Sequence, residues 1–362
     1  MGIGRNADRV IDKFLWYSYA NMSVFGGRDL VLIDNRGVGS SIPRLDCPEV
    51  EDVLLKMIQT SATESEKLVA YQDGFVECRR RLTETEGIDI SKYNVVQAAH
   101  DLNALRRGLG FDSLNLYGVS YGSRVAMVYA RQFPDATRAL VLDSVDPPHI
   151  KIYEQAPRSD WRAFERVFEM CAENERCNAR FGGDLQERFN TFLGNLDGRH
   201  IEWTMTNPRT LKPMQAKISG GVILTSLFLS MYVETSISNI PLIISSLMND
   251  SFDYIGELVR EEYVKAFSVR PFDEGAYASY NCYDEIPFND ASVAVREAGK
   301  YPIQKYMNRN AIKTDFAMCD IWNVPAGDPV EVAPVRSSIP TLLLSGALDP
   351  VTPPECAADS LQ

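Results

Sequence analysis

One stretch, "LNLYGVSYGSR" at 114–124, constrains the fold of this chain more than any other. An apolar run stops at Gly118, Ser120 lies between two glycines, and a helical pattern follows. A G-x-S-x-G sequence between a strand and a helix is typical of a sharp turn that exposes its central serine. Glycine suits positions 118 and 122 because such a turn brings these residues close together. The alternative interpretation is a glycine-rich connection without chemistry.

We predict that Ser120 is a nucleophile. The turn holds its central residue in a strained backbone conformation and directs the N-terminus of the following helix at the substrate. The backbone N–H of Tyr121 is then the expected donor of an oxyanion hole. A serine hydroxyl is a poor nucleophile while it keeps its proton, so this interpretation also requires a general base.

Continuous apolar runs elsewhere in the chain predict buried parallel strands, because strands covered on both faces lack a polar face. The four runs are "DLVLID" (29–34), "SLNLYG" (113–118), "RALVLDS" (138–144) and "IPTLLLSG" (339–346). Helical patterns separate the first three, and the one at 95–110 ends in Gly110, where a helix C-cap is expected. This alternation predicts β-α-β units and an α/β fold.

The pattern changes between residues 145 and 335, where helical segments and aromatic residues dominate. The strand pattern resumes only at Ile339. We therefore predict a mostly helical cap, inserted as residues 149–335. The core of the fold then comprises residues 1–148 and 336–362.

The composition excludes several classes of function. The 362 residues carry a formal net charge of −12, so nucleic acids and anionic membrane surfaces are not expected partners. The richest apolar stretch, at 222–233, is too short to span a membrane. The first residues, "MGIGRNADRV", lack the apolar region of a signal peptide. Nothing in the sequence predicts a cofactor.

The cysteines indicate the compartment of the protein. The seven are Cys47, Cys78, Cys171, Cys177, Cys282, Cys319 and Cys356. No two of them form C-x-x-C, and the chain has only three histidines, so a zinc site is not expected. Pairing in sequence order predicts disulfides 47–78, 171–177 and 282–319 and leaves Cys356 free, although the connectivity stays open. Such pairing indicates a periplasmic or secreted protein, whereas seven reduced thiols would indicate a cytoplasmic one.

Three segments together resemble one known family. They are "DLVLIDNRGVGSS", "LNLYGVSYGSRVAMVYARQFPDATRALVLDSVDPP" and "IPTLLLSGALDPVTPP". In these segments the chain is similar to α/β-hydrolases of the proline iminopeptidase and tripeptidyl aminopeptidase group, and most similar to the secreted tripeptidyl-aminopeptidase branch. The resemblance covers the two core blocks strongly and the cap weakly. It implies an eight-stranded, mostly parallel sheet with helices on both faces, a helical cap and a Ser-Asp-His triad.

The resemblance assigns Asp349 as the triad acid, because this residue follows the last predicted strand on a loop. Its role would be to hold a histidine in the required tautomer. The order Ser, Asp, His places the base after Asp349, but none of the thirteen residues that follow is a histidine. His100 lies in a predicted helix, and His200 lies in a predicted cap loop. His149 follows the third strand and is expected to line the pocket rather than to act as the base.

The resemblance also implies that the chain lacks segments at both ends. Family members carry an HGGPG-like turn just before the segment that begins here, and this turn supplies the second oxyanion donor. We therefore expect an internal fragment of a hydrolase with an incomplete sheet, which is inactive or nearly so as given.

The predicted function is a serine exopeptidase that cleaves residues or short peptides from free N-termini through an acyl-enzyme on Ser120. Such an enzyme needs an anion for the substrate ammonium, and Asp284 and Glu285 resemble the acidic site of related caps. The alternative for this pair is a solvated acidic loop. The alternative functions are a carboxylesterase of the same fold and a non-catalytic binding module that lacks the triad histidine. The sequence leaves the oligomeric state open.

Overall fold

The structure of the chain is a computed structural model, which describes residues 27–181, 183, 185–195, 200–232, 234–267, 272–305 and 308–360. Its first part contains α2 (Pro48–Met57), α3 (Glu64–Arg80), α4 (Val95–Gly108), β1 (Leu114–Val119), α5 (Tyr121–Gln132) and β2 (Thr137–Asp143). The helical block begins with α6 (Ile152–Glu173), α7 (Glu175–Phe181), α8 (Leu185–Asn195), β3 (Ile201–Thr206) and β4 (Pro213–Ile218). It continues with α9 (Gly220–Ser230), α10 (Glu234–Ile237), α11 (Ile240–Met248), α12 (Asp253–Phe267), α13 (Glu274–Asp284), α14 (Ala291–Ala298) and α15 (Asn308–Trp322). The last part contains β5 (Thr341–Leu344) and α16 (Pro354–Asp359).

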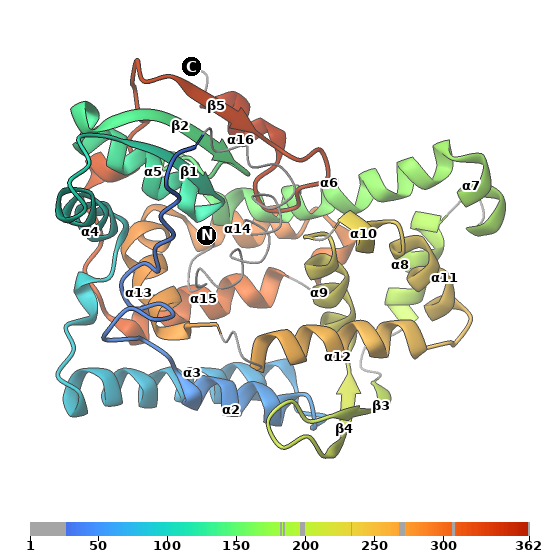
Figure 1. Cartoon of the computed structure of the whole chain (residues 1–362). Helices are drawn as coiled ribbons and strands as arrows, with labels where there is room; N and C mark the ends of the chain where they lie inside the picture. The colour runs from blue at the N-terminus through green and yellow to red at the C-terminus, as the bar shows by residue number, and fades with distance from the viewer. Residues whose placement is uncertain are drawn as a thin grey trace.

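A parallel sheet of β1, β2 and β5 lies on one side of the molecule, and α6 extends from it toward α7 and α8 (Figure 1). β2 is the middle strand, with Leu142 beside Gly118 of β1 and Asp143 beside Leu344 of β5. Because the strands are parallel, their carboxyl ends meet at one edge of the sheet. α5 packs on β1 and β2, and α4 packs on α5. This arrangement confirms the predicted α/β fold.

Three of the four predicted strands are present, as β1, β2 and β5. The prediction for residues 29–34 was wrong, because they form no strand in the structure and residues 27–31 are exposed. A strand persists where a neighbouring strand satisfies its backbone groups, and no other described segment forms a ladder with this run. The expectation that every strand is covered on both faces was also wrong for β5, where Leu342 and Leu344 are exposed.

Separate hydrophobic clusters hold the elements together. One cluster joins the sheet to α5 and includes Ala126 and Leu142. A second lies between α3, α4, α5, α13 and α15 and includes Phe75 and Trp322. A third lies within α6 to α12 and the β3–β4 hairpin. The helices α13 and α15 thus pack with the first part of the chain, and the predicted cap over residues 149–335 stays a prediction.

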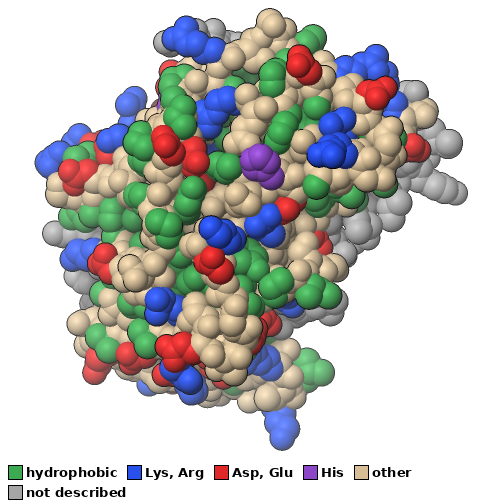
Figure 2. All heavy atoms as spheres, turned by 90° about the vertical axis from the view of Figure 1, so that its left-hand side faces the viewer, with side chains coloured by type: hydrophobic (Ala, Val, Ile, Leu, Met, Phe, Trp, Pro, Cys, Tyr) green, Lys and Arg blue, Asp and Glu red, His purple; other side chains and the backbone are tan. Residues whose placement is uncertain are grey.

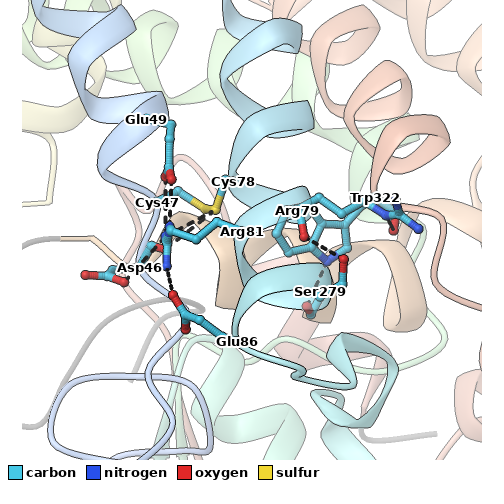
Figure 3. Close-up of a disulfide and its surroundings, with 10 residues drawn as sticks. Asp46, Cys47, Glu49, Cys78, Arg79, Arg81, Glu86, Ser279 and Trp322 are labelled. Atoms are coloured by element: carbon cyan, nitrogen blue, oxygen red, sulfur yellow. Dashed lines mark hydrogen bonds and ion pairs between the residues drawn. A yellow bond between two sulfur atoms is a disulfide. The ribbon is translucent and has the colours of Figure 1, made fainter.

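All three predicted disulfides are present, and they are Cys47–Cys78, Cys171–Cys177 and Cys282–Cys319. Cys356 on α16 is free and buried. Arg81 lies beside the first disulfide and forms ion pairs with Glu49 and Glu86 (Figure 3). The first disulfide therefore joins α2 to α3 within a set of partly buried ion pairs.

The surface mixes charges of both signs. On the face that carries α4, acidic and basic side chains are interspersed with hydrophobic ones (Figure 2). Within the part of the chain that the structure covers, no helix is both long enough and apolar enough to cross a membrane.

Candidate active site

The turn between β1 and α5 has the strained geometry predicted for Ser120. The backbone of Ser120 lies in the left-handed region, with φ 55° and ψ −128°. A Cβ atom on Gly118 would lie 2.3 Å from the carbonyl oxygen of Gly122, so only glycine fits there. Ser120 is only partly buried, and its side chain does not cap the helix. Among the residues that the structure describes, none forms a hydrogen bond with the Ser120 hydroxyl, which lies at the carboxyl edge of the sheet.

The start of α5 is fixed by hydrogen bonds around the turn. The N–H of Ser120 donates to the carbonyl of Asp143 on β2 at 2.9 Å. The hydroxyl of Ser123 donates to the carbonyl of Ser120 at 2.6 Å and accepts from the N–H of Asp146 at 2.8 Å. Because α5 begins at Tyr121, the N–H of this residue is one of the donors that a helix leaves free.

Asp349 lies on the loop between β5 and α16. One oxygen of its carboxylate accepts from the N–H groups of Val351 and Thr352, each at 2.9 Å, and the other accepts from the Thr352 hydroxyl at 2.9 Å. Arg162 on α6 donates to the backbone carbonyls of Ala347 and Asp349, each at 3.0 Å. The loop that carries Asp349 is thus held by hydrogen bonds within the loop and by Arg162 of α6.

The topology brings Ser120 and Asp349 to the same edge of the sheet. Ser120 follows β1, Asp349 follows β5, and β2 lies between these strands. Strands two positions apart in a sheet are separated by roughly 10 Å. Burial chiefly raises the pKa of the Cys356 thiol on α16 to about 12, and the charges of Asp146 and Asp349 raise it further.

The three histidines lie in different parts of the structure. His100 is exposed on α4, with its ring edge-on to Phe133, and His200 lies just before β3. His149 follows β2, and its Nδ1 atom is buried without a hydrogen-bond partner among the described residues. Burial lowers the pKa of His149, and nearby Asp359 opposes this effect. No hydrogen bond joins His149 to the hydroxyl of Ser120 in the described structure.

Asp284 at the end of α13 is buried and bound to the elements around the turn. The Tyr121 hydroxyl donates to its carboxylate at 2.6 Å, and the N–H of Val95, at the start of α4, donates at 3.0 Å. Burial raises the pKa of Asp284 to about 7, and these two donors and Arg124 oppose the rise. Asp284 thereby joins α13 to both α4 and α5.

Glu285 is also buried and forms an ion pair with Arg124 on α5. The same guanidinium contacts Asp146 at 3.2 Å and the backbone carbonyl of Asp284 at 3.3 Å. Burial raises the pKa of Glu285, and the charge of Arg124 opposes this. Two carboxyl groups and the backbone carbonyl of Asp284 therefore contact one guanidinium. The alternative of a solvated acidic loop was wrong, because Asp284 and Glu285 are 3% and 4% exposed.

Sequence reasoning missed several residues that organise this site, namely Arg124, Ser123, Asp146, Arg162 and Thr352. A signal was present for Arg124, because it is a lone charge in the apolar helical pattern "RVAMVYA". Asp146 and Arg162 act through contacts with distant segments, which their local sequence does not specify. Ser123 and Thr352 bond to residues three positions away, but serine and threonine are common in such turns and gave no distinct signal.

Comparison with known proteins identifies the family to which the chain belongs. A family model described as alpha/beta hydrolase fold matches residues 12–202, and one described as TAP-like protein matches residues 304–362. The first match covers more than half of the chain, so the chain belongs to the alpha/beta hydrolase fold family, and the second places it among the TAP-like members. The resemblance inferred from the sequence motifs is confirmed.

Several curated proteins are similar to this chain. Serine protease Hip1 of Mycobacterium bovis is 25% identical over 346 residues, which is 91% of this chain and 65% of that protein. Tripeptidyl aminopeptidase of Streptomyces lividans is 34% identical over 140 residues, which is 38% of this chain and 26% of that protein. Putative hydrolase YuaR of Escherichia coli is 26% identical over 158 residues. The chain thus spans less than two thirds of the length of the mycobacterial relative.

Proposed function

We propose that the chain is the part of a serine exopeptidase that carries the nucleophile and the triad acid. The enzyme would release residues or short peptides from free N-termini through an acyl-enzyme on Ser120. The left-handed backbone of Ser120 at the start of α5 is the observation that supports this proposal most strongly. The names of the mycobacterial and Streptomyces relatives, a serine protease and a tripeptidyl aminopeptidase, support a peptidase.

Each proposed residue has one role. The Ser120 hydroxyl attacks the substrate carbonyl, and the N–H of Tyr121 stabilises the oxyanion that forms. Asp349 orients a histidine and stabilises the imidazolium. No histidine follows Asp349 in these 362 residues, so we expect turnover by this chain alone to be absent or very slow.

Asp284 and Glu285 have an electrostatic role in this proposal. Glu285 and Asp146 both contact the single guanidinium of Arg124, and the carboxyl group of Asp284 lies against the Tyr121 hydroxyl. In their ionised forms these acids outnumber the guanidinium and would favour a cationic substrate. Their carboxylates are already bound to protein donors, so we propose that they act through the field and not through direct contact.

The disulfides support an oxidising compartment, because such bonds persist in secreted and periplasmic proteins. We therefore infer a periplasmic or secreted location.

A peptide boronic acid tests this function without requiring turnover. Boron forms a tetrahedral adduct with a serine hydroxyl and places an oxygen in the oxyanion hole. We expect ¹¹B NMR to detect an adduct of a tripeptide boronate with a free N-terminus, and Ser120→Ala to abolish it. The N-acetylated boronate should bind at least tenfold more weakly.

The other outcomes separate the alternatives. Equal adducts with both boronates would favour a carboxylesterase, and no adduct with either would favour a non-catalytic binding module. Release of nitroaniline from a tripeptide p-nitroanilide, abolished by Ser120→Ala, would show that another group such as His149 supplies the base.

A further inference from the structure

The peptide group between Ser120 and Tyr121 determines where the proposed oxyanion donor points. Its N–H is that donor, and its carbonyl belongs to Ser120. The group is trans, so it is planar and its N–H and C=O bonds point in opposite directions. The direction of the Tyr121 N–H therefore depends on the contacts that hold the Ser120 carbonyl.

The helix alone does not fix this carbonyl. The ψ angle of Ser120 is −128°, whereas the angle in an α-helix is about −42°. Two donors of Ser123 hold the carbonyl instead, namely the backbone N–H at 2.8 Å and the side-chain hydroxyl at 2.6 Å. Ser123 is 0% exposed, so the carbonyl is held on the inner side of the turn. The Tyr121 N–H is thereby directed away from the interior.

The surroundings of the Ser123 hydroxyl direct its proton. A hydroxyl has a single O–H donor, and the oxygen of this one accepts from the N–H of Asp146 at 2.8 Å. The proton is therefore committed to the Ser120 carbonyl. Hydrogen bonds to a carbonyl polarise its peptide group, so the bonds from Ser123 also make the Tyr121 N–H a stronger donor.

The loop after β2, which supplies the Asp146 N–H, is itself anchored. The carboxylate of Asp146 and the carbonyl of Pro147 accept from the guanidinium of Arg124 at 3.2 and 3.4 Å. The same guanidinium pairs with Glu285, which follows α13. Because Arg124, Asp146 and Glu285 are all buried, salt screens these contacts little. The Ser123 hydroxyl thus connects a buried ion-pair cluster to the peptide group of the turn.

We propose that Ser123 is a positioning residue whose hydroxyl orients the Tyr121 N–H toward the oxyanion that forms at Ser120. This proposal rests on the proposed acyl-enzyme chemistry, because the N–H stabilises charge only when an oxyanion forms there. Ser123 acts through the peptide group, and its loss should weaken the binding of a tetrahedral species while the nucleophile stays in place.

Three variants test this role. Ser123→Ala removes the hydroxyl and keeps the backbone N–H. Ser230→Ala is the matched control, because the Ser230 hydroxyl on α9 is also buried and donates to a carbonyl three residues earlier at 2.6 Å. Ser123→Thr restores a hydroxyl, and threonine in a helix can bond the carbonyl of the preceding turn. Urea denaturation establishes that each variant is folded.

The first measurement is the affinity for the tripeptide boronate with a free N-terminus, followed by ¹¹B NMR. The tetrahedral adduct places an oxygen in the oxyanion hole and so reports the strength of the donor. We expect Ser123→Ala to weaken the adduct about three- to tenfold, which is the effect of one hydrogen bond. Ser230→Ala should bind as the wild type does, and Ser123→Thr should recover most of the affinity.

The second measurement follows the Tyr121 amide in the chain labelled with ¹⁵N-tyrosine, where its signal is the one lost in Tyr121→Phe. Because this amide shares its peptide group with the Ser120 carbonyl, its ¹⁵N signal should move upfield in Ser123→Ala and stay in place in Ser230→Ala. Adduct formation should move its proton signal downfield in the wild type and by less in Ser123→Ala. A loss of stability alone would not move this signal in a folded variant.

The outcomes separate this role from the function on which it rests. Equal affinity of Ser123→Ala and the wild type, or an unmoved Tyr121 signal, would overturn the positioning role and leave the serine hydrolase standing. An equal loss in Ser230→Ala, or no recovery in a folded Ser123→Thr, would also overturn it. No adduct with the wild type would overturn the proposed function and this role together. If Ser123→Ala does not fold, Ser123→Cys replaces it, because its thiol fills similar space and donates only weakly.

Discussion

At the residue scale, Gly118 determines whether Ser120 can keep its geometry. A methyl group at position 118 would meet the backbone of Gly122 and Ser123, which cannot move aside like a flexible side chain. We expect Gly118→Ala to lower the free energy of unfolding by about 2 kcal/mol or more, as overpacking does. Urea denaturation followed by circular dichroism measures this loss.

Gly108 at the end of α4 provides the matched control. A Cβ atom there has no neighbour within 4 Å, and its backbone is helical. Gly108→Ala should leave the stability unchanged or raise it by up to about 1 kcal/mol. Equal losses for the two variants would contradict the strained-turn explanation.

At the scale of elements, the contribution of each disulfide to the free energy of unfolding should depend on the length of chain that it encloses. Cys282–Cys319 joins α13 to α15 with a separation of 37 residues, whereas Cys171–Cys177 has a separation of 6. In the chain-entropy model, closing these loops stabilises the fold by about 4 kcal/mol for Cys282–Cys319 and about 2 kcal/mol for Cys171–Cys177. Replacing both cysteines by alanine should therefore lower the urea midpoint more for Cys282–Cys319 than for Cys171–Cys177.

The two disulfides are matched in burial, because each has one buried and one half-buried cysteine. The comparison thus isolates the effect of the enclosed chain from that of the lost packing. A greater loss on removal of Cys171–Cys177 would show that local packing around α6 and α7, and not loop closure, decides the order.

These elements also show how far the sequence predicts the structure. The turn at Ser120, the helix that ends before Gly110 and three strands follow from local patterns, because each depends on residues adjacent in the chain. The run at 29–34 has an equally apolar pattern, but a strand also needs a neighbour, which a local pattern cannot supply. The ion pair between Arg124 and Glu285 joins residues that are far apart in the sequence, so only the fold reveals it.

At the scale of the whole molecule, buried acids should make the stability depend on pH. Burial raises the pKa of Asp284 and of Asp315 from 3.8 to about 7. The folded chain therefore binds more protons than the unfolded chain between pH 4 and pH 7, and its stability falls as the pH rises through this range. A rise of about three pKa units corresponds to about 4 kcal/mol per group, as an upper estimate.

The double variant Asp284→Asn, Asp315→Asn should lose the part of this slope that these two groups contribute, because neither amide titrates. The part due to Glu285, whose pKa burial also raises, should remain. The exposed acids Asp89 and Asp290, whose pKa values are lowered by hydrogen bonds to serine, lose their contribution as the pH falls below about 4, in both proteins. The difference between the two proteins thus isolates the buried pair. Urea midpoints measured at half-unit intervals from pH 4 to pH 8 provide the comparison, with Asp320→Asn as the exposed control. Parallel curves for the wild type and the double variant would show that neither carboxyl group is held protonated by the fold. Both would then be ionised at neutral pH, and the acids near Tyr121 and Arg124 would carry one more negative charge, on Asp284, than its raised pKa implies.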